Sequence, residues 1–371
     1  MKKKNICVLV VNRTNYSKLK PVMIELKKLN HFNIKVVVSS SGILKKYGDI
    51  SEKISDDGFK VDSLIDNLLM NDKHSSMGIS LGLSCIQFST YLENNRTDLI
   101  LTVGDRFDML GPVISAKYMN IDIIHLQGGE RSGSIDNTIR NQISLCSALH
   151  FVATEKSSDN LLKLGIDSKR VYNFGCTAIE HLLKIVPEES KFSDIDFNTK
   201  SKPILKDNEE YFVVMLHPNT VEENVSLKTI FNAVDRFNKK IFLFYPNIDA
   251  LNSSMLSEMQ TKLSDPNYII IKNLKMKNFS ILIKNSLCFI GNSSSGIRES
   301  ASFKIPFINL GDRQQNREQN NNTINCSFDE DKIVESIKLG IKLKNKLKGE
   351  NIYYKKNSSK LISKIIFEKY G

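Results

Sequence analysis

Short apolar runs recur along this chain, and stretches with a helical pattern separate them. In the first half, six such runs are apolar nearly throughout, at residues 6–11, 34–38, 99–103, 121–126, 149–153 and 171–174. Strands that are buried on both faces of a parallel sheet have this continuous apolar character. Helical patterns lie between the runs at residues 18–29, 109–119 and 156–164. The alternation of strand and helix predicts a doubly wound α/β sheet.

A second series of the same kind follows a change in composition. Residues 187–210 are rich in Lys, Asp, Ser and Pro, which is typical of a linker or a surface loop. Strand-like runs then occur at residues 212–216, 241–245, 269–271, 287–290 and 307–310, with helical patterns at 229–237 and 255–263. We therefore expect two Rossmann-like domains, residues 1–186 and 187–371, with the C-terminal helices able to pack back on the first domain. Two such domains facing a central cleft form the GT-B architecture, whose ligands bind at the carboxyl ends of the strands.

Composition excludes several classes of function. The net charge of +11 comes from lysines dispersed along the chain, which indicates a basic surface or attraction for an anionic substrate. Nucleic-acid binding would call for a dense basic stripe interleaved with aromatic residues, and the sequence has none. The six cysteines form no CxxC pair and no zinc-ligand spacing. No run approaches the ~20 apolar residues of a membrane span, so we expect a cytoplasmic protein that needs no metal and no membrane.

Acidic residues follow two of the predicted strands. Asp105 comes directly after the run at 99–103, between Gly104 and Arg106, a combination that suits the handling of a proton beside an anionic group. A capped turn with a local ion pair is the alternative interpretation. Glu130 follows the paired glycines 128–129, which would let the backbone approach a ligand closely. Asp136 is predicted to cap the helix that carries Arg140.

Polar turns that open helices are typical anion sites, because the first backbone N–H groups of a helix are unpaired. The turn after the first strand carries Arg13 and Ser17, which could hold a phosphate or a sugar hydroxyl. His217 follows a strand of the second domain, directly before a proline. The strongest local signal is Gly-Asn-Ser-Ser-Ser-Gly-Ile-Arg-Glu at residues 291–299, which predicts a nucleotide-diphosphate cradle with Glu299 placed to take the ribose hydroxyls. The segment lacks the P-loop lysine and is not GxGxxG.

Taken together, these turns resemble the hydrolysing UDP-N-acetylglucosamine 2-epimerases, a family of GT-B fold. Eight segments match in family order between residues 12 and 314: NRTNYSKLKPVM, GDRFDML, HLQGGERSGSIDNTIR, HFVATE, LHP, YPNIDA, IGNSSSGIRE and INLGDRQ. The resemblance implies that UDP leaves carbon 1 of a 2-acetamido sugar as the proton on carbon 2 is removed. Water then adds to the resulting glycal and gives the free 2-epimer.

The resemblance also implies a role for each matching residue. The proton-handling set would be Asp105, Glu130 and Asp136. Residues implied to contact the UDP-sugar are Arg13, Ser17, Arg106, His217, Asn247, Ser293, Ser294, Glu299 and Arg313. No metal or redox cofactor is implied, and the family tends to form homodimers or homotetramers.

Three positions depart from the family pattern. Gln127 stands where many members have Glu, Asn137 where many have a second acid, and Asn141 where they usually have His. An amide cannot carry protons as histidine does, so the departures bear on substrate and turnover more than on fold. The sugar could be a 2,4-diacetamido-trideoxyhexose. The alternatives left open are a non-hydrolysing 2-epimerase, a GT-B glycosyltransferase and a nucleotide-sugar binder without catalysis.

Overall fold

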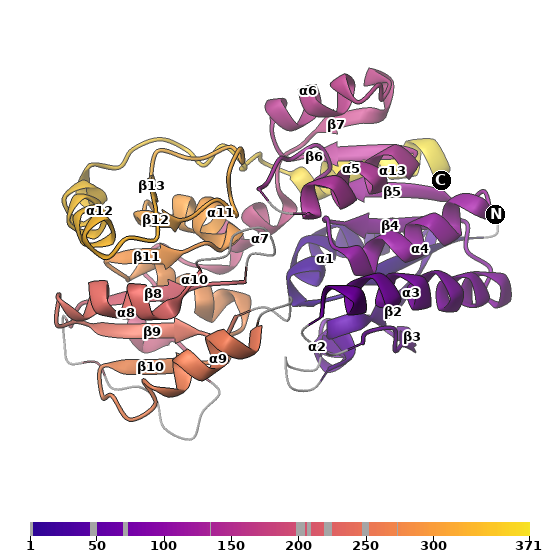
Figure 1. Ribbon diagram of the computed structural model, residues 1–371. Coiled ribbons are helices and arrows are strands. Elements are labelled where there is room, and N and C mark those ends of the chain that lie inside the picture. Colours follow the sequence, from indigo (N-terminus) through magenta and orange to yellow (C-terminus); the bar gives the residue numbers. More distant parts are fainter. Residues whose placement is uncertain are drawn as a thin grey trace. The chain divides into compact units, whose positions relative to one another are not determined.

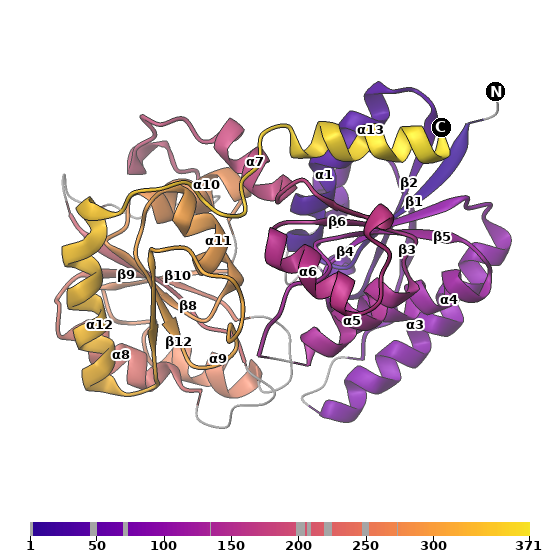
Figure 2. The same ribbon diagram turned by 90° about the horizontal axis from the view of Figure 1, so that it is seen from above.

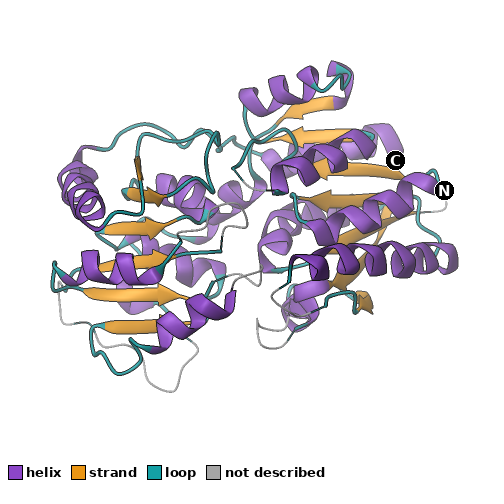
Figure 3. Cartoon of the chain, viewed as in Figure 1, coloured by secondary structure: helices purple, strands orange, loops and turns teal. Residues whose placement is uncertain are grey.

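Two compact units make up the chain in a computed structural model. The structure describes residues 3–44, 50–69, 73–133, 135–197, 205, 209–218, 225–246, 252–272 and 274–371. The N-terminal unit comprises Met1–Arg131, Ile135–His181 and Tyr353–Gly371, and the C-terminal unit comprises Ser132–Ser134 and Leu182–Ile352. Figure 1 labels the elements of both units, and Figure 3 shows strands and helices alternating within each.

The N-terminal unit is built on a parallel sheet in the order β3-β2-β1-β4-β5-β6-β7, as far as its described residues show. Its strands are β1 (Lys4–Val10), β2 (Phe32–Ser39), β3 (Val61–Ile65), β4 (Leu99–Val103), β5 (Asp122–Leu126), β6 (Leu149–Val152) and β7 (Val171–Asn173). Its helices are α1 (Arg13–Lys28), α2 (Ile50–Asp56), α3 (His74–Asn94), α4 (Phe107–Tyr118), α5 (Asp136–Cys146), α6 (Glu155–Lys163) and α13 (Ser358–Tyr370). Helix α7 (Thr177–Ile185) begins in this unit and ends in the other. The order reverses between β1 and β4, as in doubly wound nucleotide-binding folds.

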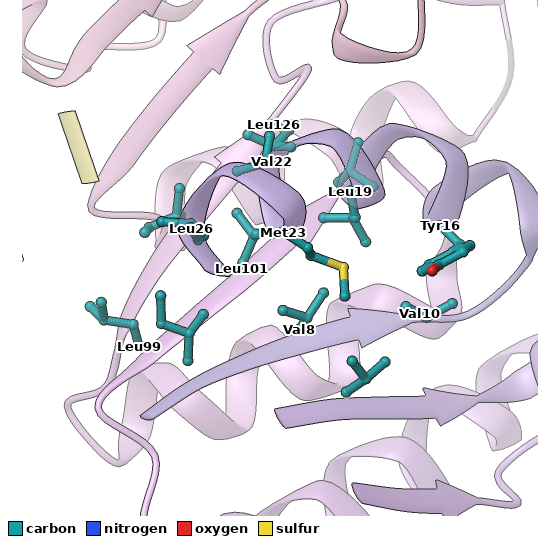
Figure 4. Packing of buried hydrophobic residues seen from close by; sticks show 14 of the residues in the cluster. Val8, Val10, Tyr16, Leu19, Val22, Met23, Leu26, Leu99, Leu101 and Leu126 are labelled. Atoms are coloured by element: carbon teal, nitrogen blue, oxygen red, sulfur yellow. The ribbon is translucent and has the colours of Figure 1, made fainter. Parts of the chain in front are cut away.

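Both faces of this sheet are buried, which is why its strands read as continuous apolar runs. Along β1, Val8 and Val10 belong to one core cluster, whereas Cys7 and Leu9 belong to the cluster on the opposite face. Helix α1 contributes apolar side chains at a spacing of three and four residues to the first cluster. Figure 4 shows these side chains lying over β1 and β4, with Tyr16, Leu19, Val22, Met23 and Leu26 labelled.

The C-terminal helix belongs to the N-terminal unit. Helix α13 packs on α1, as Figure 2 shows, and Ile362 and Ile366 join the same core cluster as β1. The buried carboxylate of Glu180 accepts hydrogen bonds from the backbone N–H and the hydroxyl of Ser359, at 3.0 and 2.8 Å. A carboxylate at this first turn satisfies unpaired N–H groups and favours the helix dipole.

The C-terminal unit has a parallel sheet in the order β10-β9-β8-β11-β12-β13 over its described residues. Its strands are β8 (Tyr211–Met215), β9 (Lys240–Phe244), β10 (Tyr268–Ile271), β11 (Cys288–Gly291), β12 (Phe307–Leu310) and β13 (Thr323–Cys326). Its helices are α8 (Leu227–Asp235), α9 (Asn252–Gln260), α10 (Met276–Lys284), α11 (Ser294–Ser302) and α12 (Glu330–Leu343). Here too the order reverses between the first and fourth strands, β8 and β11. The predicted pair of doubly wound sheets is confirmed.

Two strands and several helices were not predicted from the sequence, and one assignment was wrong. Strand β3 lies at a sheet edge and is largely exposed or half-buried, and β13 lies at the other unit's edge beside the Asn-rich loop. Helices α2, α3, α7 and α10 were also missed. Asp136 is the first residue of α5, and Ile135 occupies the N-cap position, so Asp136 is not the cap.

Part of the predicted linker packs against the C-terminal unit. Phe192 and Phe197 contact the rings of Tyr211 and Phe242, with centroid separations between 5.5 and 5.9 Å. These aromatic side chains cover the strands β8 and β9, so residues 187–197 extend the core of that unit although their composition is polar.

Candidate active site

The three predicted acids come together around one buried arginine in the N-terminal unit. Asp105 follows β4, Glu130 follows β5, and Asp136 starts α5, so all three lie at or after the carboxyl ends of adjacent strands. Arg140 projects from α5 one turn after Asp136 and is almost fully buried. We call these four residues the acid cluster.

Arg140 holds the acid cluster by hydrogen bonds and by charge. Its guanidinium donates through Nη2 to Oδ2 of Asp105 and through Nη1 to the backbone carbonyl of Glu130, the latter at 2.7 Å. Burial opposes the charge, but the carboxylates of Asp105, Glu130 and Asp136 outweigh it and raise the pKa of Arg140. The arginine is therefore cationic at every working pH, and it favours the ionised form of neighbouring carboxylates.

A buried histidine lies beneath this cluster. His125, on β5, has Nε2 2.9 Å from the carbonyl oxygen of Gly104 and Nδ1 3.1 Å from the hydroxyl of Ser144 on α5. Burial, with a smaller effect from the charge of Arg140, lowers the pKa of His125 from 6.5 to about 4. The ring is neutral at pH 7. Sequence reasoning did not single out this residue, because a histidine inside a strand looks like any core residue.

Arg106 pairs with the carboxylate of Asp108, two residues later in the same turn. Its Nε lies 3.4 Å from Oδ2 of Asp108, which is 1% exposed and also accepts a 2.6 Å hydrogen bond from the hydroxyl of Ser40. The guanidinium also lies over the ring of Phe107, 5.4 Å from its centroid. The local ion pair of this turn thus joins Arg106 to Asp108, while Asp105 pairs with Arg140.

The turn after β1 has the predicted form of a polar helix start. Asn12 caps α1 by accepting a 2.8 Å hydrogen bond from the N–H of Asn15. Arg13 is the first residue of the helix and is half-buried, and Ser17 donates to the carbonyl of Thr14 at 2.8 Å. The Asn15 amide donates to the carbonyl of Val103, so this helix start is tied to the end of β4.

The serine-rich segment joins β11 to α11 as predicted. Ser293 is the N-cap, with its hydroxyl accepting from the N–H of Ser295, and Ser294 begins the helix. Gly291 has φ +140°, and a Cβ there would lie 1.9 Å from the carbonyl oxygen of Met215, so only glycine fits this close approach to β8. The segment, residues 291–295, is called the serine turn below.

A buried asparagine ties the serine turn to the histidine that follows β8. Asn292 accepts a hydrogen bond from the N–H of His217 and donates to the carbonyl of His217, both at 2.8 Å. Its own carbonyl accepts from Arg313 at 3.2 Å and from Gln314 at 2.9 Å. His217, the serine turn and Arg313 are thereby gathered at the switch point of this sheet, where doubly wound folds bind nucleotides. The sequence did not reveal the bridging role of Asn292 or the part of Gln314.

Of two further predicted residues, the structure describes Glu299 but not Asn247. Glu299 is half-buried on α11, one turn and a half from Ser293, on the helix that the serine turn opens. Asn247 lies outside the described residues. Within the described residues, no cluster of His, Cys, Asp and Glu could hold a metal ion, and no helix is long and apolar enough to cross a bilayer.

Two of the three departures from the family pattern lie on α5 with Arg140, and the third, Gln127, lies three residues before Glu130. Gln127 is buried with φ +63°, and its amide donates to the thiol of Cys176 at 2.9 Å. Asn137 has its amide oxygen 3.5 Å from Nη1 of Arg140, and Asn141 is half-buried on the same helix. Two amides thus take positions in the first turns of α5, next to the arginine that binds Asp105.

Comparisons with known proteins identify the family of the chain. The family model described as UDP-N-acetylglucosamine 2-epimerase matches residues 24–367. The chain is 29% identical over 350 residues to the UDP-N,N'-diacetylbacillosamine 2-epimerase (hydrolyzing) of Legionella pneumophila, covering 92% of this chain and 89% of the relative. It is 30% identical over 337 residues to the GDP/UDP-N,N'-diacetylbacillosamine 2-epimerase (hydrolyzing) of Campylobacter jejuni, covering 89% and 86%.

Solved structures confirm the fold. The UDP-GlcNAc 2-epimerase from Neisseria meningitidis, bound to UDP-GlcNAc, superposes with a TM-score of 0.81 at 21% identity, covering 98% of this chain and all of that one. The Methanocaldococcus jannaschii enzyme, in complex with UDP-GlcNAc and UDP, gives 0.80 at 19% identity, covering 99% and all of that chain. The fold is GT-B, and the chain belongs to the UDP-N-acetylglucosamine 2-epimerase family.

Proposed function

We propose that this enzyme is a hydrolysing 2-epimerase that converts a UDP-linked 2-acetamido sugar to UDP and the free 2-epimer. The single observation that carries the proposal is the acid cluster, in which three carboxylates surround one buried guanidinium. Removing the weakly acidic proton from a sugar carbon needs a general base held within reach of it, and carboxylates can serve in that role. The hydrolysing relatives from Legionella and Campylobacter support the choice of reaction type.

The proposed reaction has two steps. A carboxylate takes the proton from carbon 2, the electron pair of that C–H bond forms the double bond to carbon 1, and UDP leaves with the electron pair of the C1–O bond. Water then adds across the glycal, with its hydroxyl going to carbon 1 and a proton going to carbon 2 from the opposite face. We propose Asp105, Glu130 and Asp136 as the groups that take and return these protons.

The C-terminal unit is proposed to bind the nucleotide. Ser293 and Ser294 would meet the diphosphate with the free N–H groups at the start of α11, and His217 and Arg313 would add donors. Glu299 would accept hydrogen bonds from the ribose hydroxyls, and Asn247 would line the nucleotide pocket. Positive charge from Arg13 and Arg106 would stabilise the departing UDP, with Ser17 contacting the substrate.

We propose a sugar with acetamido groups at carbons 2 and 4 as the preferred substrate. The two relatives described above are named for UDP-N,N'-diacetylbacillosamine. UDP-N-acetylglucosamine is the second sugar to test, since the family model carries its name. The free 2-epimer formed from either sugar would serve the synthesis of cell-surface polysaccharides, through a sialic- or legionaminic-acid type of product.

The test is product analysis by proton and phosphorus NMR in heavy water, with UDP- and GDP-linked forms of both sugars. We expect free UDP and a free 2-epimer that carries deuterium at carbon 2. A product that keeps its diphosphate would identify a non-hydrolysing epimerase. Retention of the original hydrogen at carbon 2 would contradict proton abstraction, and UDP release that requires an acceptor sugar would indicate a glycosyltransferase. If the protein binds these sugar nucleotides but converts none of them, it would be a nucleotide-sugar binder without catalysis.

A further inference from the structure

We propose that His125 is a positioning residue, a neutral imidazole that fixes the Asp105 turn against helix α5 and so sets the geometry of the acid cluster. The kinetic part of this inference rests on the proposed function, whereas its structural part does not. His125 itself has no proposed contact with substrate. It acts through the segments that carry the acids.

The contacts of the ring define its tautomer. A carbonyl oxygen only accepts, so the 2.9 Å contact to Gly104 requires a hydrogen on Nε2 of His125. A neutral imidazole has one N–H, which leaves a lone pair on Nδ1. The hydroxyl of Ser144 therefore donates to Nδ1 across 3.1 Å. The ring thus joins the residue before Asp105 to the residue one helical turn after Arg140.

The surroundings of His125 keep the ring in this neutral form. It is fully buried, and the groups that act on it are the cation of Arg140 and the carboxylates of Asp105 and Glu130. The ring of His150, on the neighbouring strand, lies 6.5 Å away and has its own pKa lowered to about 3, chiefly by burial. A protonated ring would donate from both nitrogens, so the hydroxyl of Ser144 would have to accept instead of donating. Burial disfavours that charged ring, so at pH 7 Ser144 is the donor and Nδ1 the acceptor.

The third acid-bearing segment also packs on this ring. A Cβ added at Gly128 would lie 2.9 Å from Nδ1 of His125 and 2.7 Å from the hydroxyl of Ser144. Glu130 follows two residues later and is held through its carbonyl by Arg140. The turn after β4, the turn after β5 and helix α5 therefore meet at one imidazole. A displacement there of about 1 Å would misplace all three acids, and such errors can cost about 100-fold in rate.

The experiment compares His125→Phe, which keeps a ring without nitrogen, with His125→Gln, whose amide can still donate to Gly104. The matched control is His150→Phe, at a buried histidine of the same sheet. We expect His125→Phe to lower kcat by about 10- to 100-fold with KM and UDP affinity within about threefold. His125→Gln should recover part of kcat, and His150→Phe should keep kcat within about threefold of the parent.

Two measurements test the inference without turnover. Nitrogen-15 NMR of labelled histidine should show a protonated Nε2 and an unprotonated Nδ1 for His125 at pH 7. Hydrogen exchange of a peptide spanning residues 103–108 should be about tenfold faster in His125→Phe than in the parent or in His150→Phe.

The outcomes separate this inference from the proposed function. Unchanged kcat in a folded His125→Phe protein, or unchanged exchange in that peptide, would overturn the positioning role. A His125 ring protonated on Nδ1 at pH 7 would contradict the proposed pair of hydrogen bonds, from Nε2 to Gly104 and from Ser144 to Nδ1. A parent enzyme that releases UDP from no sugar nucleotide would end the proposed function alone, because the exchange and NMR results would still decide the role of His125.

Discussion

The acid cluster of the N-terminal unit and the serine turn of the C-terminal unit use opposite chemistry on the same kind of scaffold. Both follow strands next to the point where the sheet order reverses. The acid cluster is charged, since a buried guanidinium gathers three carboxylates. The serine turn is joined to His217 through the neutral amide of Asn292 and uses hydroxyls and helix-start N–H groups.

This difference fits the role proposed above for each unit. Moving protons on and off carbon requires ionisable groups in a site where charges interact strongly, and burying them is costly unless they are paired. A diphosphate already brings the negative charge, so the proposed nucleotide site would rely mainly on hydroxyls and helix-start N–H groups, with Arg313 adding a cation. We therefore expect substitutions in the acid cluster to change turnover and stability, and those around the serine turn to change affinity.

The largest expected effect is on turnover from Glu130→Gln. The amide keeps the shape but cannot take a proton, so kcat should fall by about 100- to 10,000-fold, the usual contribution of general acid–base catalysis. UDP affinity, measured by calorimetry, should stay within about twofold. The matched variant Glu299→Gln should behave in the opposite way, weakening UDP binding about tenfold while keeping most of kcat at saturation.

Collapse of UDP binding in Glu130→Gln, with normal turnover of whatever substrate still binds, would show that the roles of the two units are misassigned. Loss of kcat in Glu299→Gln at saturating substrate would show that the C-terminal unit also contributes to turnover.

The second prediction concerns the buried charge. Arg140→Met keeps an unbranched side chain, two atoms shorter than arginine, but leaves three carboxylates without their common cation. We expect the free energy of unfolding to fall by about 3–5 kcal/mol, as for other buried pairs that lose one partner. Arg140→Lys should recover part of this loss, because it keeps the charge but not the forked geometry. Equal stability of the Met variant and the parent in urea denaturation would show that the charge contributes nothing net to the fold.

The positions of the acids could be predicted from the sequence, but their partners could not. Asp105 and Glu130 directly follow apolar runs, and the carboxyl ends of parallel strands share one edge of the sheet. Asp105 is bound by Arg140, whereas its sequence neighbour Arg106 pairs with Asp108. This pairing depends on how α5 packs, which no local sequence pattern encodes. The strands β3 and β13 were missed because polar residues interrupt their short sequences, VDSLI and TINC, which therefore lack the continuous apolar character on which the prediction relied.

Asn292 shows the same limit in the C-terminal unit. Its place inside a serine-rich turn was visible, but its bonds to His217 require β8 and β11 to be neighbours. The two strands are more than 70 residues apart, and strand order is a property of the folded sheet. His125 was missed for a related reason, since its partners come from the turn after β4 and from α5.

The third prediction tests whether a neutral bridge matters less to stability than a charged one. Asn292→Ala removes two hydrogen bonds and leaves the backbone groups of His217 buried. We expect a loss of about 1–3 kcal/mol in the free energy of unfolding and about tenfold weaker UDP binding. The control is Lys338→Ala at an exposed position of α12 in the same unit, where both quantities should barely change. A loss as large as that of Arg140→Met would contradict the distinction between the two units.

The smallest effect is a pH dependence carried by the N-terminal unit. Burial lowers the pKa of His125 to about 4 and that of His150 to about 3, whereas an unfolded histidine titrates near 6.5. The unfolded chain therefore binds more protons between these values, so the free energy of unfolding falls as the pH drops below about 6.5. Each histidine should contribute about 1 kcal/mol of this loss between pH 7 and pH 5.5. Denaturation of the parent and of His150→Phe at both pH values measures it, because the variant should lose about 1 kcal/mol less on acidification. Identical losses in the two proteins would mean that His150 is already protonated, or solvated, in the native N-terminal unit.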